Sequence, residues 1–171
     1  MEKKKVYLSG PDRLKKDRVA LYKEKKKLCE KYGFEMLEYP EEVFRVKDSV
    51  ENNLKVAQKR LELIKECDII IADTVDFRSF VEPYSEVGFE MGVGYGLGKK
   101  MYCYMPDARL CRERFPGEKK FVEGKGYTDQ NGVGFEPGPV NLMLEYSATI
   151  VEGTLEDALK VVAEDVKKGE I

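Results

Sequence analysis

The chain alternates between short, continuous apolar runs and longer stretches in which apolar residues recur at helical spacing. Val6 to Ser9 is a short apolar run that ends at a turn, and Asp68 to Asp73 is a β-branched run without polar alternation. A continuous apolar run of this kind is typical of a strand that is covered on both faces of a sheet. Further strands are predicted at Phe34 to Glu38, Met101 to Met105 and Ser147 to Val151.

The first two helices are predicted between these strands. One extends from about Lys15 to Tyr32, with Gly33 at the position of a C-terminal cap. The second begins at the capping box Asp48-x-x-Glu51. Its apolar face is predicted to contain Leu54, Ala57, Leu61 and Ile64.

Two more helices are predicted in the second half of the chain. Ser85 is a favourable N-cap for a short, tightly packed helix that reaches about Leu97. Thr154-x-x-Asp157 is a second capping box and begins a final amphipathic helix that ends near Gly169.

This order of strands and helices predicts an α/β fold with a single doubly wound, mostly parallel five-stranded sheet and helices on both faces, flavodoxin-like or Rossmann-like. We expect residues 1–171 to form one domain, because the length is that of a single domain. Residues 106–138 are predicted to be a long irregular loop with a function, either a lid or a subunit contact. Ligands of such sheets bind beyond the carboxyl ends of the strands.

Composition narrows the class of protein. With 30 Lys plus Arg and 32 Asp plus Glu, the formal net charge is −2 and the charges are mixed along the chain. This argues against a nucleic-acid partner. No apolar run approaches the roughly 20 residues of a membrane span, and the N-terminus does not resemble a secretory signal. The cysteines show no Cys-x-x-Cys pair and are predicted to be reduced core thiols, so we expect a cytoplasmic protein.

The sequence contains no histidine. Nucleophile systems that depend on histidine, and zinc sites that use imidazole, are therefore excluded. Acid and base chemistry must come from Asp, Glu, Tyr, Lys or Cys, and we expect neither a metal nor a cofactor.

The glycine-rich run from Gly92 to Gly98 does not have the spacing of a nucleotide-binding loop. A P-loop would need glycine at Val93, and a dinucleotide motif would need glycine at Leu97. The run is predicted to allow a helix to pack closely on the sheet.

Glu90 is the strongest candidate for chemistry. It is an ionisable residue between Gly88 and Gly92, near the start of a helix that follows the central strand. Glycine within a helix costs about 1 kcal/mol relative to alanine, so the pair indicates close approach of a backbone or a ligand. The helix N-terminus favours an ionised carboxylate. The alternative is a solvated helix glutamate paired with a nearby lysine.

Four segments, in order, resemble the nucleoside 2-deoxyribosyltransferases and the related nucleoside 5'-monophosphate N-glycosidases. The resemblance spans nearly the whole chain. The segments are Val6 to Asp12, Cys67 to Asp73, Phe77 to Gly92 with Glu82-Pro83-x-Ser85 and Gly88-Phe89-Glu90-Met91-Gly92, and Asn131 to Leu144 with Glu136 and Gly138-Pro139-Val140-Asn141.

The resemblance implies that Glu90 is a nucleophile, that Tyr7 positions its carboxylate, and that Asn141 and Met143 reach the pocket of a neighbouring subunit. It implies a retaining reaction through a glycosyl-glutamate intermediate, with a nucleoside and a free nucleobase as partners. A homodimer or a dimer-based homo-oligomer with shared active sites is expected. The expected substrate-binding residues are Ser9, Gly10, Pro11, Asp12, Phe77, Arg78, Glu82, Tyr84, Ser85, Gly88, Asn141 and Met143.

The chain departs from the family pattern at two positions where transferases often carry aspartate. Tyr84 stands six residues before Glu90, and Arg60 stands on the helix before the central strand. Asp73 is the candidate catalytic substitute at the end of that strand, and Glu82 or Glu86 are further candidates. Each has an alternative role, either as a solvent-exposed loop residue that aids solubility or as a helix cap.

Three functions remain open at this point. The favoured one is transfer of 2-deoxyribose between nucleobases. The second is hydrolysis of the N-glycosidic bond of a nucleoside or its 5'-monophosphate, in which Arg78 and Ser85 would bind the phosphate; their alternative roles are a surface arginine and a helix cap. The third is nucleoside binding without catalysis. Purine or pyrimidine preference is not determined by the sequence.

Overall fold

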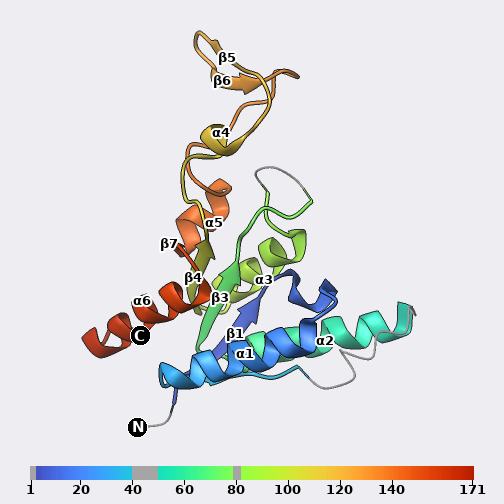
Figure 1. Ribbon diagram of the computed structural model, residues 1–171, viewed down its shortest axis with the longest axis vertical. Helices are drawn as coiled ribbons and strands as arrows, with labels where there is room; N and C mark the ends of the chain where they lie inside the picture. The colour runs from blue at the N-terminus through green and yellow to red at the C-terminus, as the bar shows by residue number, and fades with distance from the viewer. Residues whose placement is uncertain (1–2, 40–49, 79–81) are drawn as a thin grey trace.

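The computed structural model describes residues 3–39, 50–78 and 82–171 (Figure 1). Five strands form one parallel sheet in the order β2-β1-β3-β4-β7. Their bounds are β1 Lys5–Ser9, β2 Glu35–Met36, β3 Ile69–Asp73, β4 Lys100–Met105 and β7 Thr149–Glu152. The predicted α/β fold is therefore confirmed, and every pairing in this sheet is parallel.

The central strand is β3, as its uninterrupted apolar sequence predicts. All of its residues are buried. It pairs with β1 through Val6 and Ile69 and with β4 through Ile69 and Lys100. The strand order places the switch in winding direction between β1 and β3, and in doubly wound sheets the ligand crevice lies at this point.

Helices cover both faces of the sheet. Their bounds are α1 Arg18–Lys31, α2 Val50–Glu66, α3 Ser85–Gly96, α4 Cys111–Arg114, α5 Leu142–Ser147 and α6 Leu155–Lys168, with a short 3-10 helix η1 at Pro11–Leu14. The expected caps at Gly33 and Gly169 are confirmed, since both have positive φ, and Thr154 and Asp157 form the expected capping box.

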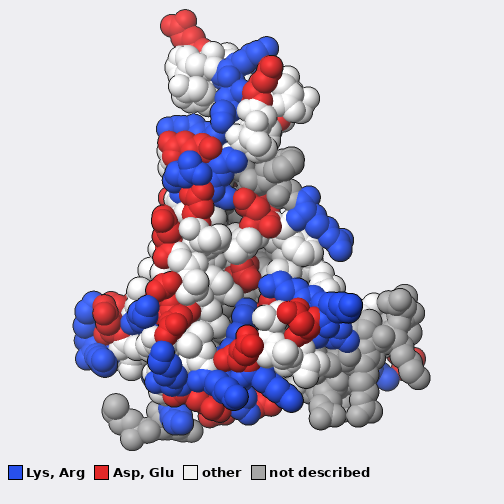
Figure 2. Space-filling view, viewed as in Figure 1, with Lys and Arg blue, Asp and Glu red and all other residues white. Residues whose placement is uncertain are grey.

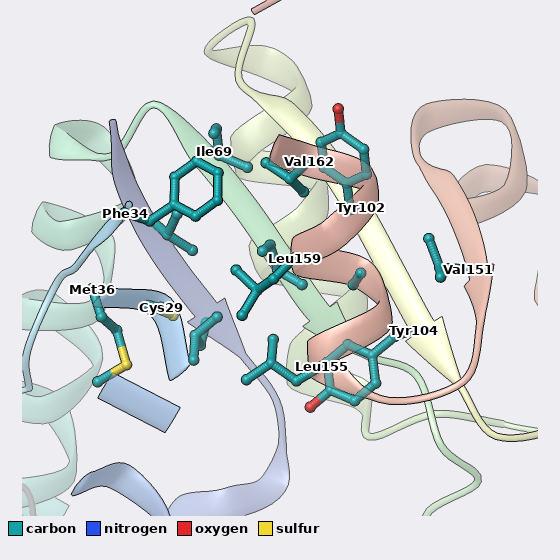
Figure 3. Close-up of a cluster of buried hydrophobic side chains, with 14 residues drawn as sticks. Cys29, Phe34, Met36, Ile69, Tyr102, Tyr104, Val151, Leu155, Leu159 and Val162 are labelled. Atoms are coloured by element: carbon teal, nitrogen blue, oxygen red, sulfur yellow. The ribbon is translucent and has the colours of Figure 1, made fainter. Parts of the chain in front are cut away.

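One face of the sheet packs against α1 and α6 (Figure 3). Alternate side chains of the strands point to this face, among them Ile69 and Tyr102, and they contact Leu159 and Val162 of α6 in one buried cluster. Because successive side chains of a strand point to opposite faces, the intervening residues must face the other layer.

The other face packs against α2, α3 and α5. Tyr7, Ile70 and Cys103 belong to this second buried cluster, together with Met91 of α3. Gly94 is the glycine of α3 that this packing requires: a Cβ atom there would lie 2.3 Å from Cδ1 of Ile70. The predicted close packing of a helix on the sheet is confirmed at this residue.

Several predicted details were wrong. Ser85 is the first residue of α3 rather than its cap; the cap position is Tyr84, whose side chain makes no capping hydrogen bond. Leu54 is 66% exposed, because the first turns of α2 lie at its end away from the sheet (Figure 1). Ser147 ends α5 and does not begin a strand. The expected capping residue Asp48 lies outside the described residues.

The stretch expected to be an irregular loop contains regular structure. It includes α4 and an antiparallel hairpin of β5 Lys119–Val122 and β6 Gly126–Asp129. These elements extend away from the body of the sheet (Figure 1). A function for this segment remains a prediction.

The surface carries both charge signs, interspersed on the face drawn in Figure 2. All four cysteines are free and buried, as expected: Cys29, Cys67, Cys103 and Cys111. Within the described ranges, no helix is both long and apolar enough to cross a membrane.

Candidate active site

Glu90 lies on the second turn of α3 and is only 3% exposed. Its carboxylate points toward the carboxyl end of β1, where it accepts a hydrogen bond of 2.6 Å on each oxygen. Tyr7 donates to Oε1 and Ser9 donates to Oε2. The predicted candidate is therefore a buried, fixed carboxylate and not a solvated helix glutamate.

Tyr7 and Ser9 reach Glu90 because of the strand period. They are two residues apart on β1, so both side chains point to the α3 face of the sheet. Tyr7 also accepts a hydrogen bond of 2.7 Å from the hydroxyl of Tyr39, which follows β2. Two hydroxyl groups thus bind the carboxylate directly, and the third binds Tyr7.

Arg60 of α2 approaches the same carboxylate from another side. Its Nη2 lies 2.6 Å from Oε1 of Glu90, and its Nε donates to the hydroxyl of Tyr7 over 3.3 Å. Its Nη1 forms an ion pair with Glu86. The Arg60 side chain is 7% exposed, so its charge is compensated almost entirely by these two carboxylates.

Glu86 connects Arg60 to a second arginine. Arg13 of η1 forms an ion pair with Glu86 and donates a hydrogen bond of 2.9 Å to the hydroxyl of Tyr84. Two guanidinium groups and two carboxylates therefore alternate along this edge of the site.

The environment shifts the pKa values of both carboxylates, in opposite directions. Burial raises the pKa of Glu90, and the charge of Arg60 and the hydrogen bonds from Ser9 and Tyr7 only partly oppose this. Burial also tends to raise the pKa of Glu86, but hydrogen bonds with Arg13, Tyr84 and Arg60 lower it to about 2. Glu86 is therefore ionised at neutral pH.

The phenol of Tyr7 is held in its protonated form. Burial raises its pKa well above the ordinary value, and the neighbouring Tyr39 and Glu90 add to the effect. Tyr7 therefore remains a hydrogen-bond donor to Glu90 throughout the neutral range.

A cavity of about 390 Å³ opens beside Glu90, between α2 and α3. Its polar border is formed by Arg13, Asn53, Arg60, Glu86 and Glu90, and its apolar border includes Val56 and Phe89. This size is in the range of small-molecule sites.

The residues of the loop after β1 have different surroundings, and only some of them lie near Glu90. Gly10 is required because a Cβ atom there would lie 2.9 Å from Cβ of Asp73. Asp12 is buried in ion pairs with Lys15 and Lys25. Pro11 begins η1, which carries Arg13 to the cavity.

Asp73 points to the opposite face of the sheet from Glu90. Its Oδ1 accepts a hydrogen bond of 3.1 Å from the backbone N–H of Val75, and it interacts with Tyr104, which belongs to the cluster under α1 and α6. A catalytic role for Asp73 has no support from these contacts and stays a prediction.

The loop after β3 folds against Tyr84. The Phe77 ring lies 4.9 Å from the Tyr84 ring, and the Arg78 guanidinium lies 5.1 Å from the Phe77 ring. Arg78 has a φ of 54°, an uncommon value for a residue with a side chain. The backbone N–H of Phe77 donates to the carbonyl of Glu82.

Asn141 and Met143 lie elsewhere on the chain. They border a separate cavity of about 150 Å³ between α3 and α5, which also includes Gly88 and Tyr95. Asn141 caps α5, since its Oδ1 accepts the backbone N–H of Leu144. Neither residue borders the cavity of Glu90 in the same chain.

Three residues of the site were not predicted from the sequence to take part in it. Arg13 and Tyr39 were not identified, and Arg60 was noted only as a departure from a family pattern. The residue types alone carried no signal, because arginine and tyrosine are common on solvent-exposed helices and loops.

The chain is similar in sequence and in structure to known proteins. The sequence model of the family described as nucleoside 2-deoxyribosyltransferase matches residues 6–144. A search of curated proteins finds no match. Among solved structures, a 2-desoxiribosyltransferase from Leishmania mexicana is 27% identical with a TM-score of 0.70, covering 94% of this chain and 97% of the other.

Two further solved structures share the fold at lower identity. A 2-deoxyribosyltransferase from Bacillus psychrosaccharolyticus is 19% identical with a TM-score of 0.54, and 93% of this chain and 90% of that chain are covered. A conserved protein from Enterococcus faecalis V583 is 13% identical with a TM-score of 0.55, and the coverage is 98% and 99%.

Proposed function

This chain belongs to the nucleoside 2-deoxyribosyltransferase family and is an enzyme of that kind, and from this premise we propose that it transfers 2-deoxyribose between nucleobases through a covalent bond to Glu90. The observation that supports the proposal most directly is the buried Glu90 carboxylate, held by Tyr7 and Ser9 at the border of a cavity.

The reaction requires a nucleophile and a way to release the base. One oxygen of Glu90 attacks the anomeric carbon of the sugar, the bond between that carbon and the base nitrogen breaks, and a glycosyl ester forms. A second base then attacks the same carbon and releases Glu90. Two displacements at one carbon retain its configuration.

The neighbours of Glu90 would perform separate tasks. Tyr7 and Ser9 fix both carboxylate oxygens, which orients the nucleophile before the substrate binds. Arg60 compensates the negative charge that burial makes costly.

The site is proposed to be completed by a second copy of this chain. Met143 is 73% exposed and Tyr146 is 76% exposed on α5, beside the exposed Tyr95 of α3. An apolar patch of this kind is typical of an interaction surface. The sequence alone predicts that Leu142, Met143 and Leu144 are exposed together and bury against a second subunit. That prediction is wrong for Leu144, which is buried in the core of its own chain.

Continuity between the patch and the active-site helix supports this assembly. Gly88 and Gly92 are exposed on α3, and a Cβ atom at either position would meet no other atom within 4 Å. The close approach that these glycines indicate is therefore assigned to a partner. In a two-fold dimer, the surface with Asn141 and Met143 would face the α3 of the other subunit.

An exchange assay tests the proposed function. The protein is incubated with a 2'-deoxyribonucleoside, with and without a second free base, and the free base and the new nucleoside are measured. Formation of the new nucleoside supports transfer. Release of base without exchange would assign hydrolysis, and binding without either product would overturn the catalytic proposal.

A further inference from the structure

The cavity beside Glu90 is bordered by two arginines, which are hydrogen-bond donors, and by two carboxylates. Arg13 and Arg60 both border it, and the second carboxylate on its border, Glu86, pairs with both of them. Arg60 also contacts Glu90 and Tyr7. A guanidinium has more N–H donors than these contacts use, so donors remain for a ligand.

No residue described on this border is suited to give a proton to a departing base. Glu86 is ionised, because its hydrogen bonds with the arginines and Tyr84 outweigh the effect of burial and lower its pKa to about 2. An arginine does not deprotonate in proteins. The other described border residues are Asn53, Val56, Ala57, Leu61, Phe89 and the nucleophile Glu90.

A departing base can instead be stabilised as an anion. When the bond from the anomeric carbon to the base nitrogen breaks, its electron pair stays with the base. The negative charge spreads to a carbonyl oxygen of an oxo-base, and N–H groups aimed at developing charge lower the barrier. No proton transfer is needed in this step: Glu90 loses its negative charge as the ester forms, so the Arg60 guanidinium that paired with it can balance the charge of the base.

The two arginines on this border disfavour a base that presents an amino group to them. An exocyclic amino group is a donor, and the guanidinium groups are also donors without an acceptor. Binding such a base would leave donors without partners in a partly buried site, which is costly. The pairing of Arg13 and Arg60 therefore distinguishes carbonyl edges from amino edges.

Resting on the transferase function proposed above, we infer that the cavity selects nucleosides of oxo-bases, the 2,4-dioxopyrimidines and 6-oxopurines, and that Arg60 and Arg13 bind the carbonyl edge of the base as it departs as an anion. In this role both arginines contact the substrate. Glu86 is a positioning residue that holds the two guanidinium groups together.

The experiment compares matched pairs of deoxyribonucleosides. Values of kcat/KM are measured for deoxyuridine against deoxycytidine and for deoxyinosine against deoxyadenosine. The oxo member of each pair should be preferred by about 10- to 100-fold, the range expected for a hydrogen bond to a charged group. 5-Fluorodeoxyuridine, whose base is more acidic, should react faster than deoxyuridine.

Variants assign the preference to the arginines. Arg60→Met and Arg13→Met should each reduce the preference for oxo-bases, and Arg60→Lys should retain part of it. Lys59→Met is the matched control: Lys59 precedes Arg60 on α2, pairs with Glu62 and does not border the cavity, so the preference should not change. The wild-type substrate series needs no variant and remains decisive if Arg60→Met fails to fold.

The outcomes separate this inference from the proposed function. Equal rates for oxo-bases and amino-bases, or rates that do not depend on the acidity of the base, would overturn the inference while transferase activity stands. A preference for deoxyuridine 5'-monophosphate over deoxyuridine, with no selectivity among bases, would assign the arginines to phosphate and also overturn it. Absence of cleavage with every nucleoside would instead contradict the proposed function.

Discussion

The hydroxyl of Tyr7 donates a hydrogen bond of 2.6 Å to Oε1 of Glu90, although 83 positions separate the two residues in the chain. Tyr7 in turn accepts hydrogen bonds from Tyr39 and Arg60. These donors make Tyr7 a stronger donor to Glu90 and fix its ring, because linked hydrogen bonds polarise one another. Glu90 lies on the helix after the central strand and is thereby oriented by residues that all precede that strand in the sequence.

Replacing Glu90 should remove covalent catalysis. Glu90→Ala is expected to abolish turnover while substrate binding is largely retained, because the variant lacks the nucleophile and keeps the cavity. With the wild-type enzyme, a 2-fluorinated nucleoside that reacts slowly should leave the mass of the sugar on the peptide that contains Glu90. Turnover by Glu90→Ala at the wild-type rate would disprove the mechanism.

The pH dependence should report the pKa of Glu90. Burial raises this pKa, and the nucleophile must be ionised, so kcat/KM should fall on acidification at a pH above the ordinary glutamate pKa of about 4.3. Among the described residues, the charged or titratable groups near Glu90 are Tyr7, Tyr39, Arg60 and Glu86.

Tyr7→Phe should shift this acid limb. The hydrogen bond from Tyr7 stabilises the ionised carboxylate, so its loss raises the pKa of Glu90 and moves the limb to higher pH. The value of kcat/KM should fall by about 10- to 100-fold, as expected for one hydrogen bond to a charged group. Tyr102→Phe is the control, since Tyr102 donates to Asp165 on the other face of the sheet. An unchanged acid limb in Tyr7→Phe would contradict the assignment.

Glu86 should contribute stability that depends on pH. Its pKa of about 2 in the folded protein lies below the unfolded value, so the folded state gains stability at pH above about 4.3. This contribution is lost as the pH falls toward 2. Thermal unfolding should therefore show a lower Tm for Glu86→Gln than for wild type near pH 6, and the two Tm values should converge only as the pH falls toward 2. A constant Tm difference would argue against the ion pairs.

The close contact between α3 and the sheet should make Gly94 sensitive to substitution. Gly94→Ala places Cβ 2.3 Å from Cδ1 of Ile70 before relaxation, and such overpacking costs about 1 to 3 kcal/mol. The Tm should fall by about 2 to 4 °C for each kcal/mol. Gly96→Ala is the control on the same helix, because a Cβ atom there meets no atom within 4 Å. It should not lower the Tm; equal losses in both variants would disprove the packing argument.

Two inactive variants should restore each other if active sites are shared. Glu90→Ala and Asn141→Ala are mixed under conditions that allow subunits to exchange, and activity is compared with that of each variant alone. Some mixed dimers then contain one site with both residues intact. Sedimentation of the wild type as a monomer, or no recovery after exchange has been demonstrated, would refute the shared site.

The sequence by itself determined the layered architecture. A short, continuous apolar run such as Ile69 to Asp73 is typical of a buried strand. The helices between such strands act as crossover connections, which make the strands parallel. It also identified Glu90, because an acidic residue between two helix glycines is locally costly and so indicates a function.

Only the tertiary structure decided what surrounds that carboxylate. Arg60 and Glu86 are far apart in sequence, and whether they pair depends on the rotation of α2 and α3 about their axes and on the distance between them. Local propensity determines neither quantity. The alternation of β1 could place Tyr7 and Ser9 on one face, but the side of the sheet taken by Asp73 depended on the register of β3 against β1. Contacts between distant segments follow from packing of the whole core, and so the partners of Glu90 could not be read from the sequence around it.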